Sequence, residues 1–544
     1  MLIQSSASYQ TINLNFIDHE RTPLLTSRKE NTWEQLKKSQ WVSLVPSIVL
    51  GLIIWFGVKP NQELTVTAIH LLAVFVSCIF ALITTSVDIS MLVLTGLTIL
   101  AASHSFVCLD HATGFDTECR LCGEVNPLTG NTVQCNAEKD SFKQSLEGFS
   151  SSVVWLIFAA FHLGKAVEVT QLGRRISLLM IRTFGKHILG LAYAILLSEL
   201  FLGPFVPSNT ARGGGIVLPV VQSIATSLNS TPKLNPEIGQ YLILIGNHAN
   251  LLSASMYLTG MAANPVVIAK ANQLFPHLNF DFMTWFRGSI VPSATCAIFL
   301  PLLLKWSLSI DKLGNKTESE NGDAVVKHAQ LELDKMGSVS KKEWQLCFVL
   351  LSCLCMWVTT SITHLDSTLV ALIGIVALLH MGTISWKDVS TNTSAWDTLF
   401  WLGGFITIAQ QLSEAGASAF LGHQISNTIK RFNFPSVPSL AISYFLTTFM
   451  FSSLSAHIVA FAGTFFDAGH MLGANPMILT AMIAYFGSLS GCMTNFSTGM
   501  AAMYYATGYV SRPKWFMIGF QVAIFYLFVY FTVGVSWWKF LGWI

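Results

Sequence analysis

Long apolar segments follow one another along most of this chain, and two of them are interrupted by short polar stretches. Of its 544 residues, 52% are hydrophobic and only 11% are charged. Soluble domains carry about 25% charged residues, and each charge left in hydrocarbon costs roughly 3 kcal/mol, so this deficit indicates an integral membrane protein. We therefore predict an all-α polytopic fold, because helices satisfy every backbone polar group within lipid.

The two polar interruptions resemble each other. The first covers residues 207–215 and the second covers residues 453–457. Each leads with hydroxyl side chains and places a nitrogen base four residues after its first serine, so that Arg212 follows Ser208 and His457 follows Ser453. Irregular polar backbone at membrane depth is tolerated only where it is buried in protein or lines a cavity. A duplicated pair of such breaks predicts the substrate site of a secondary transporter.

The apolar runs predict about 11 transmembrane helices, at roughly 20 residues for each crossing, together with two re-entrant hairpins. The N-terminal half, residues 42–306, is expected to contain a hairpin at 188–227 and spans at 42–58, 65–85, 89–105, 152–170, 240–269 and 284–306. The span at 240–269 is expected to break near Ser253 and again near Thr259. The second half, residues 343–544, is expected to contain a hairpin at 435–470 and spans at 344–362, 367–382, 396–413, 476–506 and 514–536. The charged residues 307–342 predict a loop-like cytosolic linker without chemistry of its own.

The two halves share landmarks that indicate an internal duplication. They recur at a nearly constant separation: Trp155 as Trp401, Ser208 as Ser453, and Thr259-Gly260 as Thr498-Gly499. An odd number of expected crossings separates the start of one copy from the start of the next, so the copies should face opposite ways across the membrane. Inverted repeats allow two states of similar energy, each open to one side, as alternating access requires.

Residues 1–41 are expected to form a cytosolic tail. Basic side chains precede the first span, and positive charge favours the cytosolic side. The tail also holds acids, whereas transit peptides are acid-poor. Residues 20–25, running from Glu20 to Leu25, match an acidic dileucine signal of the kind that sorts proteins to endosomes or lysosomes. The alternative interpretation is a disordered tail.

Four of the ten cysteines lie in the polar loop 106–147, and these are Cys108, Cys119, Cys122 and Cys135. Three crossings after a cytosolic N-terminus put this loop on the outer or luminal side, which can be oxidising. We therefore favour two disulfides over a zinc site, although the CxxC spacing would also suit zinc. The sequence leaves the pairing open. The other cysteines lie in apolar segments and are expected to be small core residues.

With both tips in hand, the chain resembles the divalent-anion/sodium symporter family, which carries dicarboxylates, citrate or sulfate. Ser198-Glu199-Leu200, the first tip, residues 505–510 and Lys514-Trp515 are most similar to its 2-oxoglutarate/malate translocator and bacterial anion-exchanger branch. The resemblance covers roughly residues 42–544. It implies a homodimer with an elevator motion and two tips that meet around the substrate near mid-membrane. The tail and the cysteine loop depart from the plastid branch, so we expect a plasma or endosomal/lysosomal membrane and not a plastid.

Residues expected to bind a dicarboxylate supply neutral donors, helix-end dipoles or positive charge. They are Ser208, Asn209, Thr210, Arg212, Ser453, Ser455, His457, Thr259, Gly260, Thr498 and Gly499. The resemblance puts its first Ser-Asn-Thr signature on Ser208 to Thr210, and Ser455 stands where the exchanger branch usually has a threonine. Arg212 could instead bond backbone carbonyls, and His457 could be a satisfied core histidine.

The sequence gives less support for a substrate-binding role of other polar side chains in the apolar segments. His162, His248 and His470 are expected to be structural, and Lys165 and Glu168 are expected either to pair with each other or to reach the membrane interface. Asn247 and Asn250 could line the cavity near the broken span.

Fixed positive charges at both tips would let the site carry a dianion across the membrane without sodium. An empty site with a permanent charge would cross the membrane poorly. We therefore predict exchange of dicarboxylates, with sodium- or proton-coupled uptake, or sulfate or citrate as cargo, as alternatives. An anion channel is the rival of another class. The chain lacks the sequence motifs of metalloproteases, serine hydrolases and nucleotide-binding enzymes, so we expect neither an enzyme nor a cofactor. The net charge of +2 argues against nucleic acid, which leaves lipid, the substrate and a second copy as partners.

Overall fold

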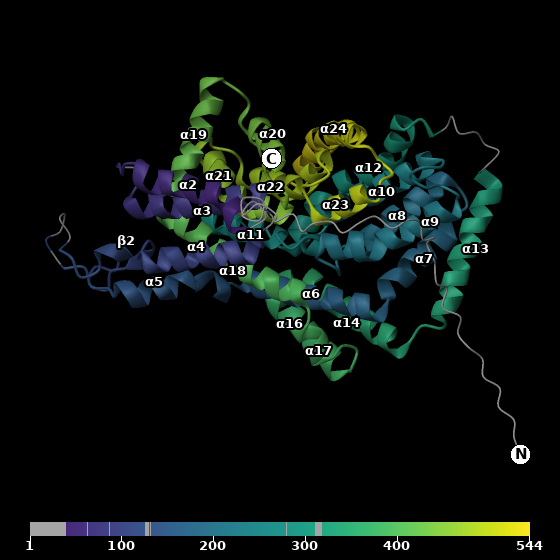
Figure 1. The fold of residues 1–544 in the computed structure, drawn as a ribbon, viewed down its shortest axis with the longest axis horizontal. Coiled ribbons are helices and arrows are strands. Elements are labelled where there is room, and N and C mark those ends of the chain that lie inside the picture. The colour runs from purple at the N-terminus through teal and green to yellow at the C-terminus, as the bar shows by residue number, and fades with distance from the viewer. Residues whose placement is uncertain are drawn as a thin grey trace, which may run out of the picture.

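The computed structural model describes residues 40–61, 64–85, 87–125, 130, 132–278, 280–310 and 318–544. Nearly all of the expected tail, including the dileucine segment 20–25, lies outside the described residues. The described chain is almost entirely helical (Figure 1). Its exception is a small antiparallel hairpin of β1 (Val107–Leu109) and β2 (Asp116–Glu118) in the cysteine loop, which the all-α prediction did not include.

The N-terminal half follows the predicted spans closely. Its helices are α2 (Gln40–Gly57), α3 (Val66–Thr84), α4 (Ile89–Ala102), α5 (Ala137–Ser145), α6 (Ser152–Thr170), α7 (Leu172–Phe184), α8 (Ile188–Leu202), the π-helix η3 (Thr210–Val217), α9 (Leu218–Ser227), α10 (Pro236–Met256), η4 (Leu258–Gly260), α11 (Asn264–Leu274) and α12 (Phe282–Ser307). Short 3₁₀ turns at Cys119–Leu121 (η1) and Glu147–Ser150 (η2) complete the cysteine loop.

The second half contains the same succession of elements. Its helices are α14 (Lys341–Val358), α15 (Thr360–Thr363), α16 (Ser367–His380), α17 (Trp386–Ser390), α18 (Thr393–Glu414), α19 (Ala417–Arg431), α20 (Ser436–Thr447), η6 (Thr448–Met450), α21 (Leu454–Met471), α22 (Pro476–Leu489), η7 (Ser490–Met493), α23 (Gly499–Ala506), α24 (Arg512–Val529), η8 (Tyr530–Gly534) and α25 (Val535–Phe540). From α6 and from α18 onward, both series run through an amphipathic helix, a tip, a broken helix and a long final helix.

One predicted break is in the wrong place. The sequence predicted that the span after the first hairpin would break near Ser253, but α10 continues through Met256 and the chain leaves the helix at Tyr257. The small hydroxyl residues do not end the helix because they pack against neighbours. Ser253 Oγ donates to the Glu199 carbonyl at 2.7 Å, which joins α10 to α8.

The prediction of a loop-like linker is also wrong, because residues 318–336 form helix α13 (Glu318–Met336). Charged residues dominate this segment, but Val325, Ala329 and Leu333 recur at helical spacing and are buried. This narrow stripe packs on α7, and Arg174 Nη2 pairs with Glu332 Oε2 at 2.7 Å beside it. In Figure 1, α13 lies at one end of the long axis and the cysteine loop, with β2 and α5, lies at the other.

The prediction of two disulfides is confirmed. Cys108 bonds to Cys119 and Cys122 bonds to Cys135. The loop is also tied to the helices, because Glu118 Oε2 accepts the Thr67 hydroxyl at 2.7 Å at the start of α3. 

Asp110 organises the turn within the same loop. Hydrogen bonds from the Thr113 hydroxyl and from the backbone N–H groups of Ala112 and Gln134 hold the pKa of Asp110 below its ordinary value of 3.8.

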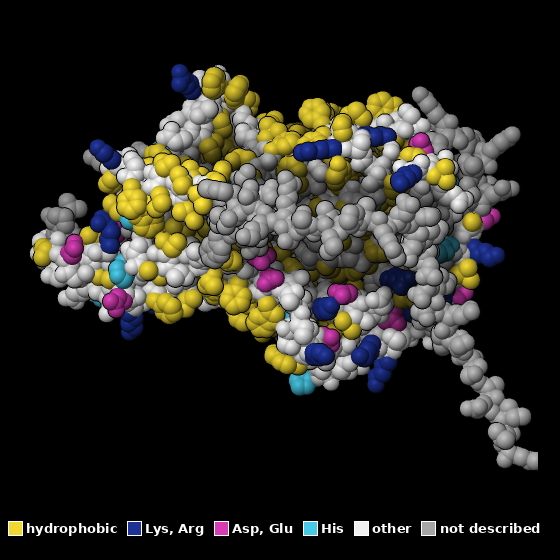
Figure 2. Space-filling model, viewed as in Figure 1, with side chains coloured by type: hydrophobic (Ala, Val, Ile, Leu, Met, Phe, Trp, Pro, Cys, Tyr) yellow, Lys and Arg dark blue, Asp and Glu magenta, His cyan; other side chains and the backbone are white. Residues whose placement is uncertain are grey.

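Exposed apolar ridges run along the outside of several helices. On α24, Met517, Phe520, Ile524 and Phe528 recur on one face and are 49%, 62%, 53% and 65% exposed. Figure 2 shows hydrophobic side chains gathered over α2 and α3, and charged ones gathered near α14 and α17. A soluble monomer rarely exposes contiguous apolar surface of this extent, which lipid would cover.

Five helices among the described residues are long and apolar enough to cross a bilayer, by length and composition. Further apolar helices are shorter, such as those at Ile89–Ala102, Ile188–Leu202 and Ser436–Met450. Their pattern agrees with a multi-pass membrane protein, while the count of crossings stays a prediction.

The apolar interior contains two clusters of buried side chains. The larger cluster joins α6–α12 with α14, α16, α20 and α22–α24. The smaller cluster joins α2–α4 and α18 with the cysteine loop, and reaches the edges of α6 and α21. The first tip packs on the larger cluster, whereas the second tip contacts both, because Leu454 belongs to the larger cluster and Phe451 and Ala456 to the smaller one.

Candidate substrate site

The first tip begins where α8 ends and the chain turns back. Ser208 Oγ accepts the Ala211 N–H at 3.2 Å, so this serine caps the helix that leaves the tip. That helix starts as the π-helix η3, and π-helical turns occur often at functional sites. Gly213 allows the tight approach that follows, because an added Cβ would come within 2.7 Å of Met500 and 2.8 Å of Asn250 Nδ2.

The second tip repeats this construction. Ser453 Oγ accepts the Ala456 N–H at 3.3 Å and caps α21. The two leading serines that the sequence singled out therefore perform the same local task in each half. Their hydroxyl hydrogens and the first N–H groups of each helix point out of the helix end, where they suit an anion.

A single segment of the second half lies against both tips. Gly499 sits beside the first tip, where an added Cβ would be 3.0 Å from Thr210 Oγ1. Gly491 sits beside the second tip, where an added Cβ would be 2.9 Å from Leu454. Residues 490–499, which we call the shared break, thus connect the two tips. Thr498 and Gly499 belong to the shared break, and Thr210 of the first tip and Leu454 of the second tip lie against it.

Arg212 is fully buried and held by the protein itself. Its Nε donates to Glu199 Oε2 at 2.8 Å, and its Nη1 donates to the carbonyls of Val206 and, at 2.9 Å, Gly260. Its Nη2 reaches the Asn250 carbonyl at 3.4 Å. Hydrogen bonds to backbone carbonyls were the alternative to substrate binding that the sequence predicted for Arg212. In this conformation Arg212 joins the first tip to the broken helix α10–η4 and uses four of its five N–H donors within the protein.

His457 is equally buried. Its Nε2 is 2.8 Å from Thr447 Oγ1, its Nδ1 is 3.4 Å from Thr448 Oγ1, and its ring stacks on Tyr444 with centroids 4.6 Å apart. Tyr444 stands at the same spacing before His457 as Glu199 before Arg212, so an aromatic contact in the second half replaces the ion pair of the first.

His457 is also linked to the shared break. Thr448 Oγ1 donates to Ser490 Oγ at 2.5 Å, at the start of that segment. Like Arg212, His457 fixes the geometry behind its tip and has protein partners on both ring nitrogens.

The accessible polar groups are the hydroxyls at the edges of the tips. Thr210 and Gly499 are exposed, and Ser208, Ser453 and Ser455 are half-buried. Asn209 is only 9% exposed. The hydroxyls of Thr259 and Thr498 are also largely buried, because Thr259 donates to the Pro204 carbonyl at 2.8 Å and Thr498 accepts the Ala501 N–H at 2.8 Å. Gly260 is buried and presents its carbonyl to Arg212.

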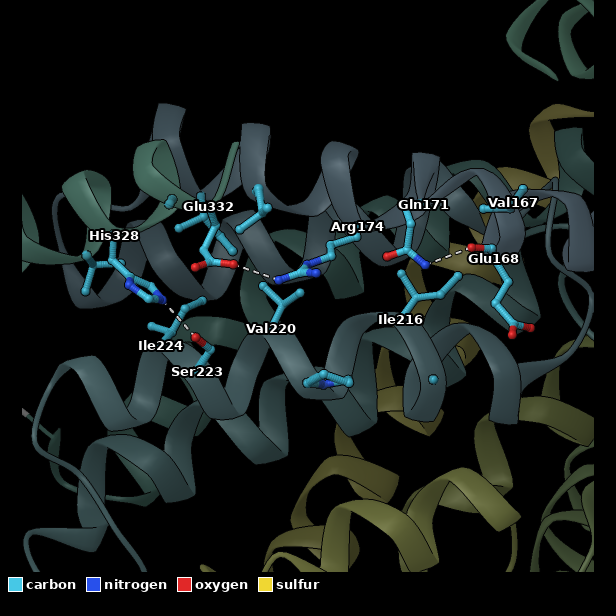
Figure 3. Close-up of a pocket in the computed structure, with 16 residues that line it drawn as sticks. Val167, Glu168, Gln171, Arg174, Ile216, Val220, Ser223, Ile224, His328 and Glu332 are labelled. Atoms are coloured by element: carbon cyan, nitrogen blue, oxygen red, sulfur yellow. Dashed lines mark hydrogen bonds and ion pairs between the residues drawn. The ribbon is translucent and has the colours of Figure 1, made fainter. Parts of the chain in front are cut away.

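Two cavities flank the first tip on the α6–α7 side. One, of about 410 Å³, is lined by Ser208 and Ala211 of the tip and by the ion pair Lys165–Glu168, whose charged atoms are 2.8 Å apart. The other, of about 310 Å³, lies between α7, α9 and α13 (Figure 3). Figure 3 shows Arg174 facing Glu332 across this second cavity. The predicted pairing of Lys165 with Glu168 is confirmed.

The remaining polar candidates, three histidines and Asn247, have different environments in the structure. His162 bonds the carbonyls of Phe158 and Val389, at 2.8 and 3.2 Å, which agrees with a structural role. His470 packs against the ring of Phe275, and His248 is buried in α10. Both side-chain polar atoms of Asn247 are buried without a hydrogen-bond partner among the described residues.

Sequence reasoning missed four residues of this site, which are Glu199, Thr448, Ser490 and Asn495. Glu199 and Ser490 are completely buried, and the amide oxygen of Asn495 lies in the shared break without a partner among the described residues. Asn250, which the sequence named only as a cavity residue, donates to Glu199 Oε2 at 3.0 Å and to the Asn209 carbonyl at 3.3 Å. The duplication gave no signal for these residues, because the separation between Thr259 and Thr498 places Leu489 opposite Asn250.

Comparison with known proteins agrees with this architecture. Residues 38–544 match the family described as the sodium:sulfate symporter transmembrane region. The putative malate transporter YflS of Bacillus subtilis is 31% identical over 513 residues, covering 93% of this chain and 98% of that protein. Dicarboxylate transporter 2.1, chloroplastic, of Arabidopsis thaliana is 32% identical, covering 76% and 73%. The L-tartrate/succinate antiporter of Shigella flexneri is 29% identical, covering 73% and 80%.

Solved structures share the fold at lower sequence similarity. MtrF of Neisseria gonorrhoeae and the YdaH transporter of Alcanivorax borkumensis each align with a TM-score of 0.51, at 12% and 11% identity. Each alignment covers 84% of this chain, and 96% and 97% of the respective structures. The family and the structural neighbours are membrane transporters and not enzymes. The chain is therefore a multi-pass membrane transporter that belongs to the divalent-anion/sodium symporter family.

Proposed function

We propose that this transporter carries small dicarboxylates of the malate, succinate and 2-oxoglutarate type. One observation carries the proposal: the first tip lies against Gly499 and the second against Gly491, at the two ends of the shared break, and the leading serine of each tip caps the helix that follows. Such groups offer neutral donors and positive dipole ends to carboxylates while still allowing release. Relatives described as malate, dicarboxylate and tartrate/succinate transporters support this substrate class.

We assign direct substrate contact to Ser208, Thr210, Ser453 and Ser455, together with backbone N–H groups near Gly499. Asn209, Thr259, Thr498 and Gly260 shape the site from behind. Arg212 and His457 act as positioning residues, since their polar atoms have protein partners in this conformation. Neither residue bonds the substrate directly in this proposal.

We propose exchange as the transport mode, with sodium- or proton-coupled uptake as the second candidate. The relative described as an antiporter supports exchange. The physical reason offered from the sequence, a permanently charged empty site, loses its support because Glu199 lies 2.8 Å from Arg212 and balances its charge. The mode therefore has to be measured directly.

In this proposal the whole transporter is an inverted repeat with about 11 crossings and two re-entrant hairpins. The succession of elements, which repeats from α6 and from α18, supports the repeat. The two apolar clusters, which meet on α6, α11, α19 and α21, support an elevator motion in which the unit with both tips slides against α2–α4 and α18. We further propose a homodimer in a plasma or endosomal/lysosomal membrane, with residues 1–41 and the linker 307–342 on the cytosolic side.

Counterflow in proteoliposomes tests the function. Vesicles loaded with unlabelled malate should accumulate labelled malate or 2-oxoglutarate, and sodium should not be required. Thr210→Val should slow counterflow at least several-fold, whereas Thr532→Val, which removes an exposed hydroxyl bonded to the Phe528 carbonyl, should not. Saturable flux with trans-stimulation identifies a carrier. Conductance without trans-stimulation would instead identify a channel, and absence of dicarboxylate flux would refute the proposal.

A further inference from the structure

The carboxylate of Glu199 is buried inside the protein, and only one of its two oxygens has a hydrogen-bond partner among the described residues. The carboxylate is fully buried at the end of α8. Its Oε2 accepts from Arg212 Nε at 2.8 Å and from Asn250 Nδ2 at 3.0 Å. Its Oε1 is buried and has no partner among the described residues, and the same holds for Asn250 Oδ1. A buried ionised oxygen without a donor is unfavourable, whereas a proton on that oxygen removes the charge.

We propose that Glu199 takes up a proton when a dicarboxylate binds, and that it thereby sets the charge of the moving unit. This inference rests on the proposed function. In the empty protein Glu199 and Arg212 are both charged and cancel. The proton comes from water and forms an O–H bond at Oε1, which leaves the positive charge of Arg212 to offset one of the two negative charges of the bound dianion.

The geometry connects the carboxylate to the substrate through the first tip. Arg212 bonds Glu199 from within η3, only two residues after the exposed Thr210. Asn250 bonds both Glu199 and the carbonyl of Asn209 at the tip. A dianion at the tip adds negative charge close to this pair, and a nearby like charge favours the protonated form of a carboxylate.

Few other ionisable groups face Glu199. Tyr504 of α23 lies closest after Arg212, and its hydroxyl donates to the Gly213 carbonyl at 3.2 Å. The other titratable side chains on helices packed against α8 do not bond Glu199, and they are Arg174, Arg175 and Arg182 of α7, Glu237, Tyr241 and His248 of α10, and Arg287, Cys296 and Lys305 of α12. Arg174 and Arg175 pair instead with Glu332 and Glu343. The site thus offers Glu199 as the proton acceptor.

Proton uptake and binding affinity test this proposal in the full-length protein in detergent. Above about pH 7 the carboxyls of malate stay ionised, so any protons taken up when malate binds are bound by the protein. Unbuffered wild-type protein mixed with malate should draw protons from a pH indicator. Its affinity should weaken by up to about tenfold for each unit rise in pH, the limit for one linked proton.

Glu199→Gln fixes a neutral side chain of the same shape, so it should bind malate without proton uptake and with a flat pH profile. Glu168→Gln, in the exposed pair with Lys165, should keep the wild-type profile. Asn250→Ala removes one donor to the ionised form, so it should shift the pH range of the affinity change upward.

Wild-type protein that binds malate without taking up protons would overturn the inference, as would a Glu199→Gln profile that superposes on the wild type. If Glu199→Gln does not fold, an unshifted profile of Asn250→Ala would overturn it. Absence of malate transport altogether would refute the proposed function instead, so the two failures are distinct.

Discussion

Removing the Arg212 guanidinium should destabilise the protein far more than removing any exposed arginine. Arg212→Ala leaves the Glu199 carboxylate buried with no cationic partner, and it takes a donor from the carbonyls of Val206, Gly260 and Asn250. Breaking a buried pair by deleting one partner costs about 3–5 kcal/mol. Each carbonyl left without a donor adds up to about 1–3 kcal/mol, with incomplete additivity.

The structure offers a matched control where α7 packs on α13. Arg174 pairs with Glu332 at a similar distance, 2.7 Å, but its side chain is 47% exposed. An exposed ion pair contributes about 0–1 kcal/mol, because water and salt screen both charges. Arg174→Ala should therefore leave the unfolding temperature almost unchanged under the conditions in which Arg212→Ala lowers it clearly.

Thermal unfolding of the detergent-solubilised protein, followed by intrinsic tryptophan fluorescence, measures the difference. The double variant Glu199→Leu with Arg212→Met removes both charges together and should recover most of the loss, since no unpaired buried charge remains. If Arg212→Ala and Arg174→Ala unfold at the same temperature, Arg212 is not the buried anchor described above. Losses from Glu199→Leu and Arg212→Met that simply add would also contradict the pairing.

Three further predictions concern other parts of the molecule. Gly499→Ala should slow dicarboxylate counterflow several-fold because its Cβ would be 3.0 Å from Thr210 Oγ1, whereas Gly463→Ala, with no atom within 4 Å, should transport normally. Val325→Asp should speed backbone hydrogen exchange throughout α13 by placing a charge against α7, and unchanged exchange would show that the helix does not need its apolar stripe. The lowered pKa of Asp110 means that its bonds support the cysteine loop fully above pH 3.8 and fail as the pH falls through the folded-state pKa. Asp110→Asn should therefore raise hydrogen exchange in that loop at neutral pH, and it should no longer respond to acid there.

The sequence predicted the tips because their signal is local. Uninterrupted apolar runs mark helices, so hydroxyls at Ser208 and Ser453 within such runs stand out without any knowledge of contacts. The caps at these serines then follow from their position at a helix start. The same reasoning located most of the spans, whose ends lie within a few residues of the observed helices.

The partners of the buried cations could not be predicted in this way. Glu199 lies in a different helix from Arg212, and nothing in the sequence shows that the two helices bring these side chains to 2.8 Å. The stripe that forms α13 was hidden because three apolar residues are outnumbered by charged ones. The choice among cysteine pairings likewise depends on the fold of the loop, in which β1 pairs with β2 and brings Cys108 beside Cys119, directly after β2.

Substrate protection of single cysteines tests most directly whether the two tips hold the substrate together. Cys355, which is exposed, would first be replaced by alanine, and Thr210→Cys and Ser455→Cys introduced separately. We predict that malate slows the reaction of a membrane-impermeant maleimide with both introduced thiols, while an uncharged diol of the same length does not. Equal labelling rates with and without malate at both positions, in protein that still transports malate, would contradict the account.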